Sequence, residues 1–296
     1  MLTVALMTVI PLPFMKWLAG GDNAAAEYAV SIFGEIVILI PSAVGILYIV
    51  AAEKKNNTLA EMTAAETIKE ITALKKAKPS ACLLGIPAML GAQYFITYLT
   101  LPVQTLLIAL FGTETATSQM IIPSGIWEYI TAFAALCIAA PIAEEILCRG
   151  VLIRLFGRYG MAAALISSSL AFALLHFEAR TFIQILFVGM LLGIFRICTG
   201  SVIPGIIMHS ANNLLSLCQM TMLAENEIIP VILCVALAVM FVPIMFVMFS
   251  RYERYFVMPD MPLKTTKPEF SLGACICIGL FALYNFGMFL EHIINL

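Results

Sequence analysis

Long apolar runs, separated by short polar segments, cover almost the whole chain. Because a membrane-spanning helix needs about 20 apolar residues, this pattern is typical of a multi-pass membrane protein. It predicts an all-α bundle of transmembrane helices that forms a single integral membrane domain over residues 1–296. Eight or nine spans are expected, since two of the candidate runs are short and close together. The candidates lie at about 2–19, 31–52, 83–111, 126–147, 161–177, 182–199, 202–222, 229–250 and 270–292.

The composition agrees with this interpretation. Of the 296 residues, 62% are hydrophobic and 11% are charged, and a soluble domain of this size could not bury so much apolar surface. The net charge of −2 offers no basic surface, so we expect no nucleic acid as a partner. The eight cysteines lie in or at the ends of apolar runs, where we interpret them as buried apolar side chains.

Lysine and arginine residues concentrate in alternate loops, chiefly in segments 53–79 and 251–268 and after the fourth run. Basic loops favour the cytoplasmic side, so nine spans with a cytoplasmic N-terminus place these clusters inside the cell. The segment 53–80 has partial helical periodicity and is expected to be a cytoplasmic or interfacial amphipathic segment; a solvated connector is the alternative. We expect a multi-pass protein of the cell membrane, and the compact chain without targeting signals favours a bacterial plasma membrane.

The polar side chains that we single out within the apolar spans lie in the second half of the chain. An ionisable residue at the centre of a span costs roughly 2.5–3.5 kcal/mol on insertion scales, so a functional site is the first hypothesis for such a group. The candidates end the fourth run, lie near the end of the fifth and interrupt the seventh: Glu144, Glu145, Arg149, His176, His209 and Asn213.

Helical spacing separates the roles of the two neighbouring carboxylates. Glu145 and Arg149 are one turn apart on the same helix face, whereas Glu144 lies about 100° further around the helix. We therefore predict that Arg149 holds Glu145 and that Glu144 faces a cavity. His209 and Asn213 are also one turn apart and can point into that cavity together.

This set of side chains is suited to hydrolysis without a serine or cysteine nucleophile. A carboxylate in a poorly solvated pocket can act as a general base toward water, and a histidine and an asparagine can donate hydrogen bonds to an oxyanion. Alternatively, Glu144, His176 and His209 are a ligand set for a divalent metal such as zinc, if a metal is used. The residues alone leave metal-bound and metal-free water open.

Three short motifs occur in order along this region. They are "EEILCR" (144–149), "FALLH" (172–176) and "HSANN" (209–213). In this pattern the chain resembles the CAAX protease and bacteriocin-processing family, also called Abi proteins. The resemblance covers about residues 125–220, the expected catalytic core from spans 4 to 7.

The resemblance implies an intramembrane endopeptidase of the glutamate type, with Glu144 as the general base and His176 helping to hold the attacking water. His209 and Asn213 would form the oxyanion site, and Glu145 and Arg149 would support it. The implied substrates are membrane-embedded or lipid-modified peptides or proteins, through CAAX-type cleavage, bacteriocin processing or immunity. A catalytically silent scaffold or immunity protein, or an ion-coupled transporter with a proton relay, is the alternative.

One geometric conflict accompanies this hypothesis. If the fourth span ends near residue 147, Glu144 lies near the cytoplasmic face, whereas His176 ends the next span near the opposite face. The site then assembles only if the run 161–177 is short, tilted or begins deep in the membrane.

Overall fold

The computed structural model describes residues 24–55, 62–111, 122–176 and 181–221, together with single positions between 232 and 243. The candidate spans 2–19 and 270–292 lie outside the described residues, as does most of 229–250, so the count of eight or nine spans stays a prediction. All regular secondary structure in the described residues is helical, which agrees with the predicted all-α class. Within the described residues, four helices are long and apolar enough to cross a membrane: Ser31–Ala52, Pro79–Ala109, Ile126–Gly157 and Phe182–Thr199.

The central element is one continuous helix from Ile126 to Gly157. It consists of α6 (Ile126–Ala132), the π-helical stretch η1 (Phe133–Ala139), α7 (Ala140–Glu145), a second π-helical stretch η2 (Ile146–Leu152) and α8 (Ile153–Gly157). The other helices are α3 (Ala24–Lys55), α4 (Ala64–Thr72), α5 (Pro79–Phe111), α9 (Met161–Leu175), α10 (Phe182–Thr199) and α11 (Ile203–Thr221).

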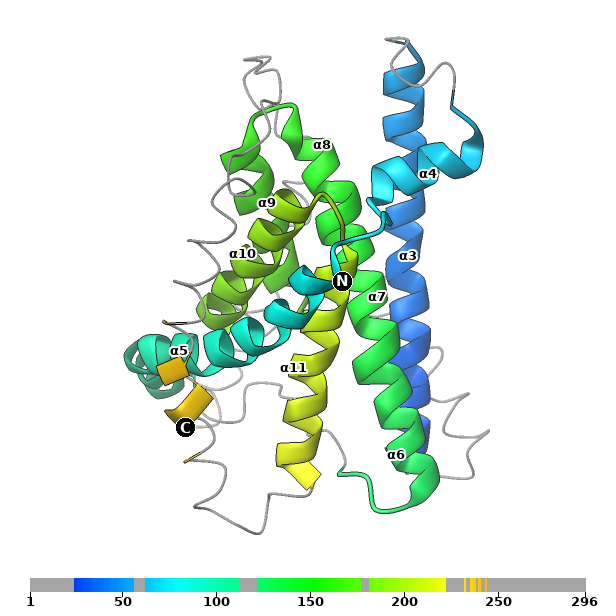
Figure 1. The fold of residues 1–296 in the computed structure, drawn as a ribbon. Helices are drawn as coiled ribbons and strands as arrows, with labels where there is room; N and C mark the ends of the chain where they lie inside the picture. The colour runs from blue at the N-terminus through cyan, green and yellow to red at the C-terminus, as the bar shows by residue number, and fades with distance from the viewer. Residues whose placement is uncertain are drawn as a thin grey trace.

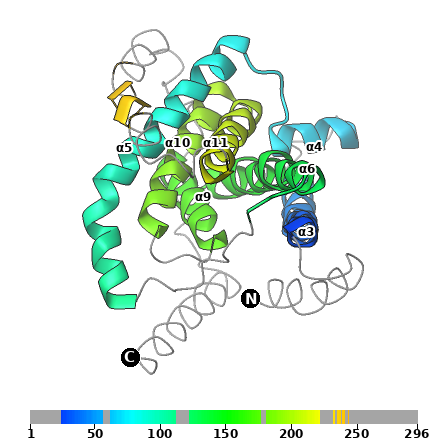
Figure 2. The same ribbon diagram turned by 90° about the horizontal axis from the view of Figure 1, so that it is seen from below.

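The described helices surround this central helix on two sides. Helix α3 runs along it and packs against α6, η1, α7 and η2, while α11 lies on another side against η1 and α7. Viewed from below, α3 lies at one edge of the bundle, α5 curves around the opposite edge, and α9, α10 and α11 lie between them (Figures 1 and 2). A buried apolar cluster joins α5, η2, α9, α10 and α11, with Met89, Leu147, Phe172, Leu192 and Met208 among its members.

The fourth predicted span is longer than the sequence suggested. We expected it to end near residue 147, but the helix continues to Gly157. The chain then turns at Gly160, whose φ of 105° suits glycine, and α9 returns alongside η2 and α8. Helix α9 is apolar but has only 15 residues, fewer than the four helices that are long enough to cross a membrane, so the run 161–177 is short, which is one of the conditions for assembly of the site.

Helix α4 forms the middle of the predicted amphipathic segment. A capping box between Thr63 and Glu66 begins it, and Ala73, in the left-handed conformation, ends it. The segment after α4 is held to the turn between α10 and α11, where Val202 N donates to Ala73 O over 3.1 Å and Ser201 Oγ donates to Lys75 O over 2.6 Å. Its placement in the cytoplasm or at the membrane interface stays a prediction.

Candidate active site

The adjacent carboxylates lie in α7, between the two π-helical stretches. π-helical turns are rare and occur frequently at functional sites, because each one rotates the following side chains relative to a regular helix. Glu144 is 8% exposed and Glu145 is fully buried. Both carboxylates therefore lie inside the protein, not at a charged helix end.

Arg149 is fixed by three separate neighbours. Its Nη1 donates to Glu145 Oε1 over 2.8 Å, and neither side chain is exposed. Its Nη2 donates to the carbonyl of Gly189 on α10 over 3.0 Å, and its guanidinium lies 4.1 Å from the centre of the Phe172 ring. The structure thus contains the Glu145–Arg149 pair that the spacing predicts, and it adds two partners from other helices.

Helix α10 can supply this carbonyl because it lies very close to α9. A Cβ on Gly189 would be 3.3 Å from Ser169 Cα, and a Cβ on Gly193 would be 2.5 Å from Leu165 Cδ1. The two glycines thus serve close helix packing, which their spacing of four residues on one helix face allows.

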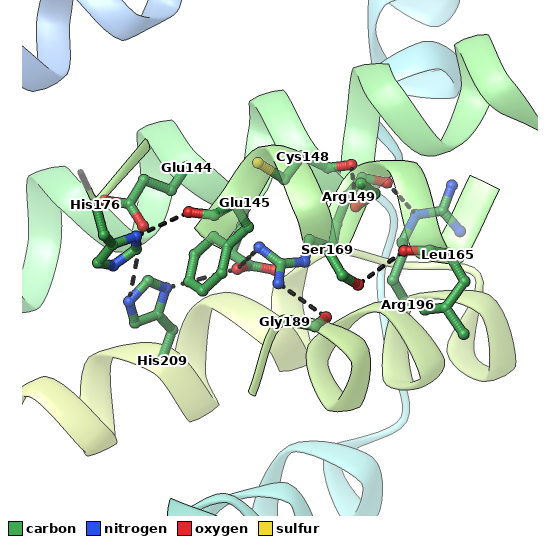
Figure 3. A network of polar contacts seen from close by, with 12 residues as sticks. Glu144, Glu145, Cys148, Arg149, Leu165, Ser169, His176, Gly189, Arg196 and His209 are labelled. Atoms are coloured by element: carbon green, nitrogen blue, oxygen red, sulfur yellow. Dashed lines mark hydrogen bonds and ion pairs between the residues drawn. The ribbon is translucent and has the colours of Figure 1, made fainter. Parts of the chain in front are cut away.

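Glu144 points away from this pair and toward His209, as Figure 3 shows. His209 Nε2 is 3.9 Å from Glu144 Oε2, and His209 Nδ1 is 3.5 Å from Glu145 Oε1. Neither Glu144 Oε2 nor His209 Nδ1 has a hydrogen-bond partner within the part of the chain that the structure describes. Glu145 Oε2 and Arg149 Nε also have no partner there. Because buried polar atoms are nearly always paired, these four atoms mark the place at which a water or a substrate can bind.

His176 follows directly after α9 and is exposed. Its Nδ1 lies 2.8 Å from the carbonyl oxygen of Phe172. A carbonyl only accepts, so Nδ1 carries the proton in the neutral ring and Nε2 is left as an acceptor. The Phe172 ring meets His176 edge-on at 4.8 Å and His209 edge-on at 5.6 Å between centroids, so one aromatic side chain joins both histidines.

The hairpin of α8 and α9 resolves the conflict of depth. Glu144 lies roughly 20 Å before the end of α8 at Gly157, and His176 lies roughly 22 Å after the start of α9 at Met161, at 1.5 Å per helical residue. The two therefore reach a similar level, and Figure 3 shows both beside His209. The expected end at residue 147 was wrong because Arg149 is not a membrane-surface charge: it is neutralised within the bundle.

Asn213 has a different contact from the predicted one. Its Nδ2 donates to the carbonyl of Leu136 in η1 over 2.8 Å. In this π-helical register, Ala140 N donates five residues back to Ala135 O, so residue 141 would donate to Leu136 O. Residue 141 is proline and has no N–H, and Asn213 satisfies the carbonyl in its place. Its second N–H remains for another acceptor.

Other helices also bind the carbonyls of η2. Ser168 Oγ of α9 donates to Cys148 O over 2.9 Å, and Arg196 Nε of α10 donates to Arg149 O over 3.1 Å. The π-helical stretches on both sides of the carboxylates are thus held by side chains from three different helices. This network sets the rotation of α7 and, with it, the directions of Glu144 and Glu145.

Glu35 was not among the residues predicted from the sequence. It is the only charged residue between Ser31 and Ala52, and a lone carboxylate in a span was the available signal. Helix α3 packs along the helix from Ile126 to Gly157, and the carboxylates of Glu35 and Glu144 interact electrostatically.

The alternative of a metal centre receives no support from the geometry. No group of three His, Cys, Asp or Glu side chains among the described residues is arranged to hold a metal ion. Glu144, His176 and His209 approach one another around Phe172 but do not converge as a ligand set.

Residues 126–215 match the sequence model of a family described as type II CAAX prenyl endopeptidase Rce1-like. This segment is Rce1-like. The match confirms the family resemblance of the three motifs, and the family is one of CAAX-type intramembrane proteases. The Rce1-like segment contains every predicted site residue, whereas Glu35 lies outside it. No curated protein and no solved structure matches the chain.

Proposed function

We propose that this protein is an intramembrane endopeptidase in which Glu144 activates the water that hydrolyses a peptide bond. The observation that carries this proposal is the contrast between the two adjacent carboxylates. Glu145 Oε1 accepts from Arg149, whereas the described residues pair no arginine or lysine with the buried Glu144, which faces His209. A carboxylate bound to an arginine is a poor base, and one in a drier site has a higher proton affinity.

The reaction then follows from the positions of these groups. Glu144 takes a proton from water as the water oxygen bonds to the substrate carbonyl carbon, and the Nε2 acceptor of His176 helps to orient that water. His209 and the second N–H of Asn213 donate to the oxyanion. When the C–N bond breaks, Glu144 returns the proton to the leaving amine, and Glu145 and Arg149 keep α7 in place throughout.

The substrate class follows from the family and the setting of the site. A peptide that reaches a site between apolar helices must itself be embedded in the membrane or carry a lipid, so we propose a membrane-embedded or prenylated peptide with a CAAX-type end. Bacteriocin-type peptides fit the same requirement. A metal is not needed for these steps.

The test is cleavage of a farnesylated CAAX-type peptide by the purified protein in detergent. Glu144→Gln should lower turnover by about 10²- to 10⁴-fold, the usual contribution of a general base. Glu128→Gln, which removes an exposed carboxylate from the same helix, is the matched control and should retain turnover. If no peptide is cleaved, or if Glu144→Gln stays active, the proposal fails, and a scaffold or an ion-coupled transporter becomes the better hypothesis.

A further inference from the structure

Glu35 is a carboxylate in an otherwise apolar part of α3. The residues around it, from Ser31 to Ala52, form a helix apolar enough to cross a membrane. Glu35 is half-buried, and its Oε2 has no hydrogen-bond partner within the described residues. An ionisable group in a membrane-spanning helix is energetically costly, so a functional role is the first hypothesis for it. Packing of α3 on its neighbours does not require a carboxylate at this position.

The neighbour that gives Glu35 a role is Glu144. Helix α3 packs on α7, and the neighbours of Glu35 set its level along that helix. Ile32 packs on the cluster that contains Cys137, and Ile38 packs on the cluster that contains Leu147. Glu35 lies between them on α3 and so at the level of Glu144, whose carboxylate acts on it electrostatically. Glu144 is more than nine-tenths buried, and its Oε2 is likewise without a hydrogen-bond partner in the described part of the chain. Two helices that are distant in the sequence thus bring two unpaired carboxyl groups together.

Two carboxylates in a dry site do not both stay ionised, because like charges repel and neither is well solvated. One of them keeps a proton. The other groups around Glu144 show which one: His209 lies 3.9 Å from Glu144, and Arg149 lies behind it on Glu145. A possible hydrogen-bond donor and a permanent cation thus lie near Glu144, and the described residues provide neither for Glu35, so we assign the proton to Glu35.

We propose that Glu35 is a positioning residue that stays a neutral carboxylic acid and donates a hydrogen bond to Glu144, so that the second oxygen of Glu144 faces the water. This inference rests on the proposed function and deepens it, because it adds an α3 residue outside the Rce1-like segment to the site. It also gives α3 a part in turnover, since displacement of α3 would remove the hydrogen bond.

Two substitutions separate this role from a structural one. Glu35→Gln keeps a neutral donor of the same size, and kcat should stay within about threefold of the original. Glu35→Leu fills the space without a donor, and kcat should fall about 10- to 100-fold, as expected for a lost hydrogen bond to a charged group, while KM and the melting temperature stay unchanged. Ser42→Ala, which removes a local hydrogen bond on the same helix, is the matched control and should be silent.

Infrared difference spectroscopy tests whether Glu35 is protonated, and it needs no substrate. At neutral pH the original protein should show the carbonyl band of a protonated carboxylic acid, and Glu35→Gln should remove it. Full activity of Glu35→Leu, or a band that persists in Glu35→Gln, overturns the proposal. If peptide cleavage itself fails, or if Glu144→Gln stays active, the proposed function is wrong, and the infrared result still decides whether Glu35 carries the proton.

Discussion

Arg149 donates to Glu145 over 2.8 Å, and the two side chains are completely buried. An ion pair so far from water gains stability from each further polar contact that its atoms make. Here the Gly189 carbonyl accepts a second hydrogen bond from the guanidinium, and the Phe172 ring covers one of its faces. Arg149 Nε and Glu145 Oε2 have no hydrogen-bond partner among the described residues. This arrangement neutralises one of two adjacent carboxylates and leaves Glu144 available for chemistry.

Breaking this pair should destabilise the protein as much as it impairs turnover. Arg149→Met leaves the Glu145 charge buried without its partner, and we expect a loss of about 3–5 kcal/mol in the free energy of unfolding. The double variant Glu145→Gln, Arg149→Met removes both charges and should recover part of that loss. Thermal unfolding in detergent provides the measurement, and equal melting temperatures for the single and double variants would contradict the buried pairing.

The contact between Asn213 and Leu136 leads to a second prediction. Asn213→Ala leaves a carbonyl of η1 without a donor, which should cost about 1–3 kcal/mol of stability. Asn212→Ala, the neighbouring substitution, is the matched control and should cost less, because no hydrogen bond of that side chain to η1 is present. Unfolding of both variants is compared in the same detergent.

Pro141 allows the structural and catalytic roles of Asn213 to be separated. In Pro141→Ala the backbone regains an N–H that can donate to Leu136 O, so adding this change to Asn213→Ala should restore the melting temperature. Turnover should remain low, because the proposed oxyanion donor is still missing. If turnover recovers together with stability, Asn213 serves only to hold η1.

The stability of α4 should depend on pH. A hydrogen bond from the Thr63 backbone N–H lowers the pKa of Glu66 below its ordinary value of 4.5, and a hydrogen bond from Lys75 lowers the pKa of Glu70. A lowered pKa in the folded state means that the stabilisation is present at neutral pH and is lost as the pH falls through the folded-state pKa, below 4.5.

Hydrogen exchange, corrected for its intrinsic pH dependence, measures this effect. Amides of α4 should lose protection below pH 4.5 while those of α10 keep theirs. Thr63→Ala should reduce α4 protection already at neutral pH, because it removes half of the capping box. Protection of α4 that is equal at both pH values would show that the two carboxylates do not stabilise it.

The orientation in the membrane is tested by single cysteines. Lys69 of α4 and Ile122 before α6 are both exposed, and the nine-span topology places them on opposite sides. In intact cells an impermeant thiol reagent should label the Ile122→Cys variant and should not label the Lys69→Cys variant. The protein without either substitution is the control, because it measures the labelling of the native cysteines. The reverse pattern would invert the predicted orientation, including that of 251–268, which lies outside the described residues.

The sequence alone was sufficient wherever the decisive interactions are local. Runs of apolar residues predicted α5, α10 and α11 closely, because a helix in lipid must satisfy its own backbone. The separation of Glu145 from Glu144 followed from helix geometry, since residues four apart share a face and adjacent residues do not.

Only the tertiary structure decided the depth of Glu144, the partner of Asn213 and the approach of Glu35. The sequence placed the end of the fourth span before Arg149, because an arginine is expected at the membrane surface. The structure buries Arg149 instead, and one of its partners is the carbonyl of Gly189, 40 residues away. Asn213 binds the carbonyl of Leu136 because Pro141 has no N–H to donate to it. Residue 141 would be the donor to Leu136 only in a π-helical register. Glu35 meets Glu144 because α3 packs on α7. Each relation depends on how separate helices pack, and helical periodicity carries no information about that packing.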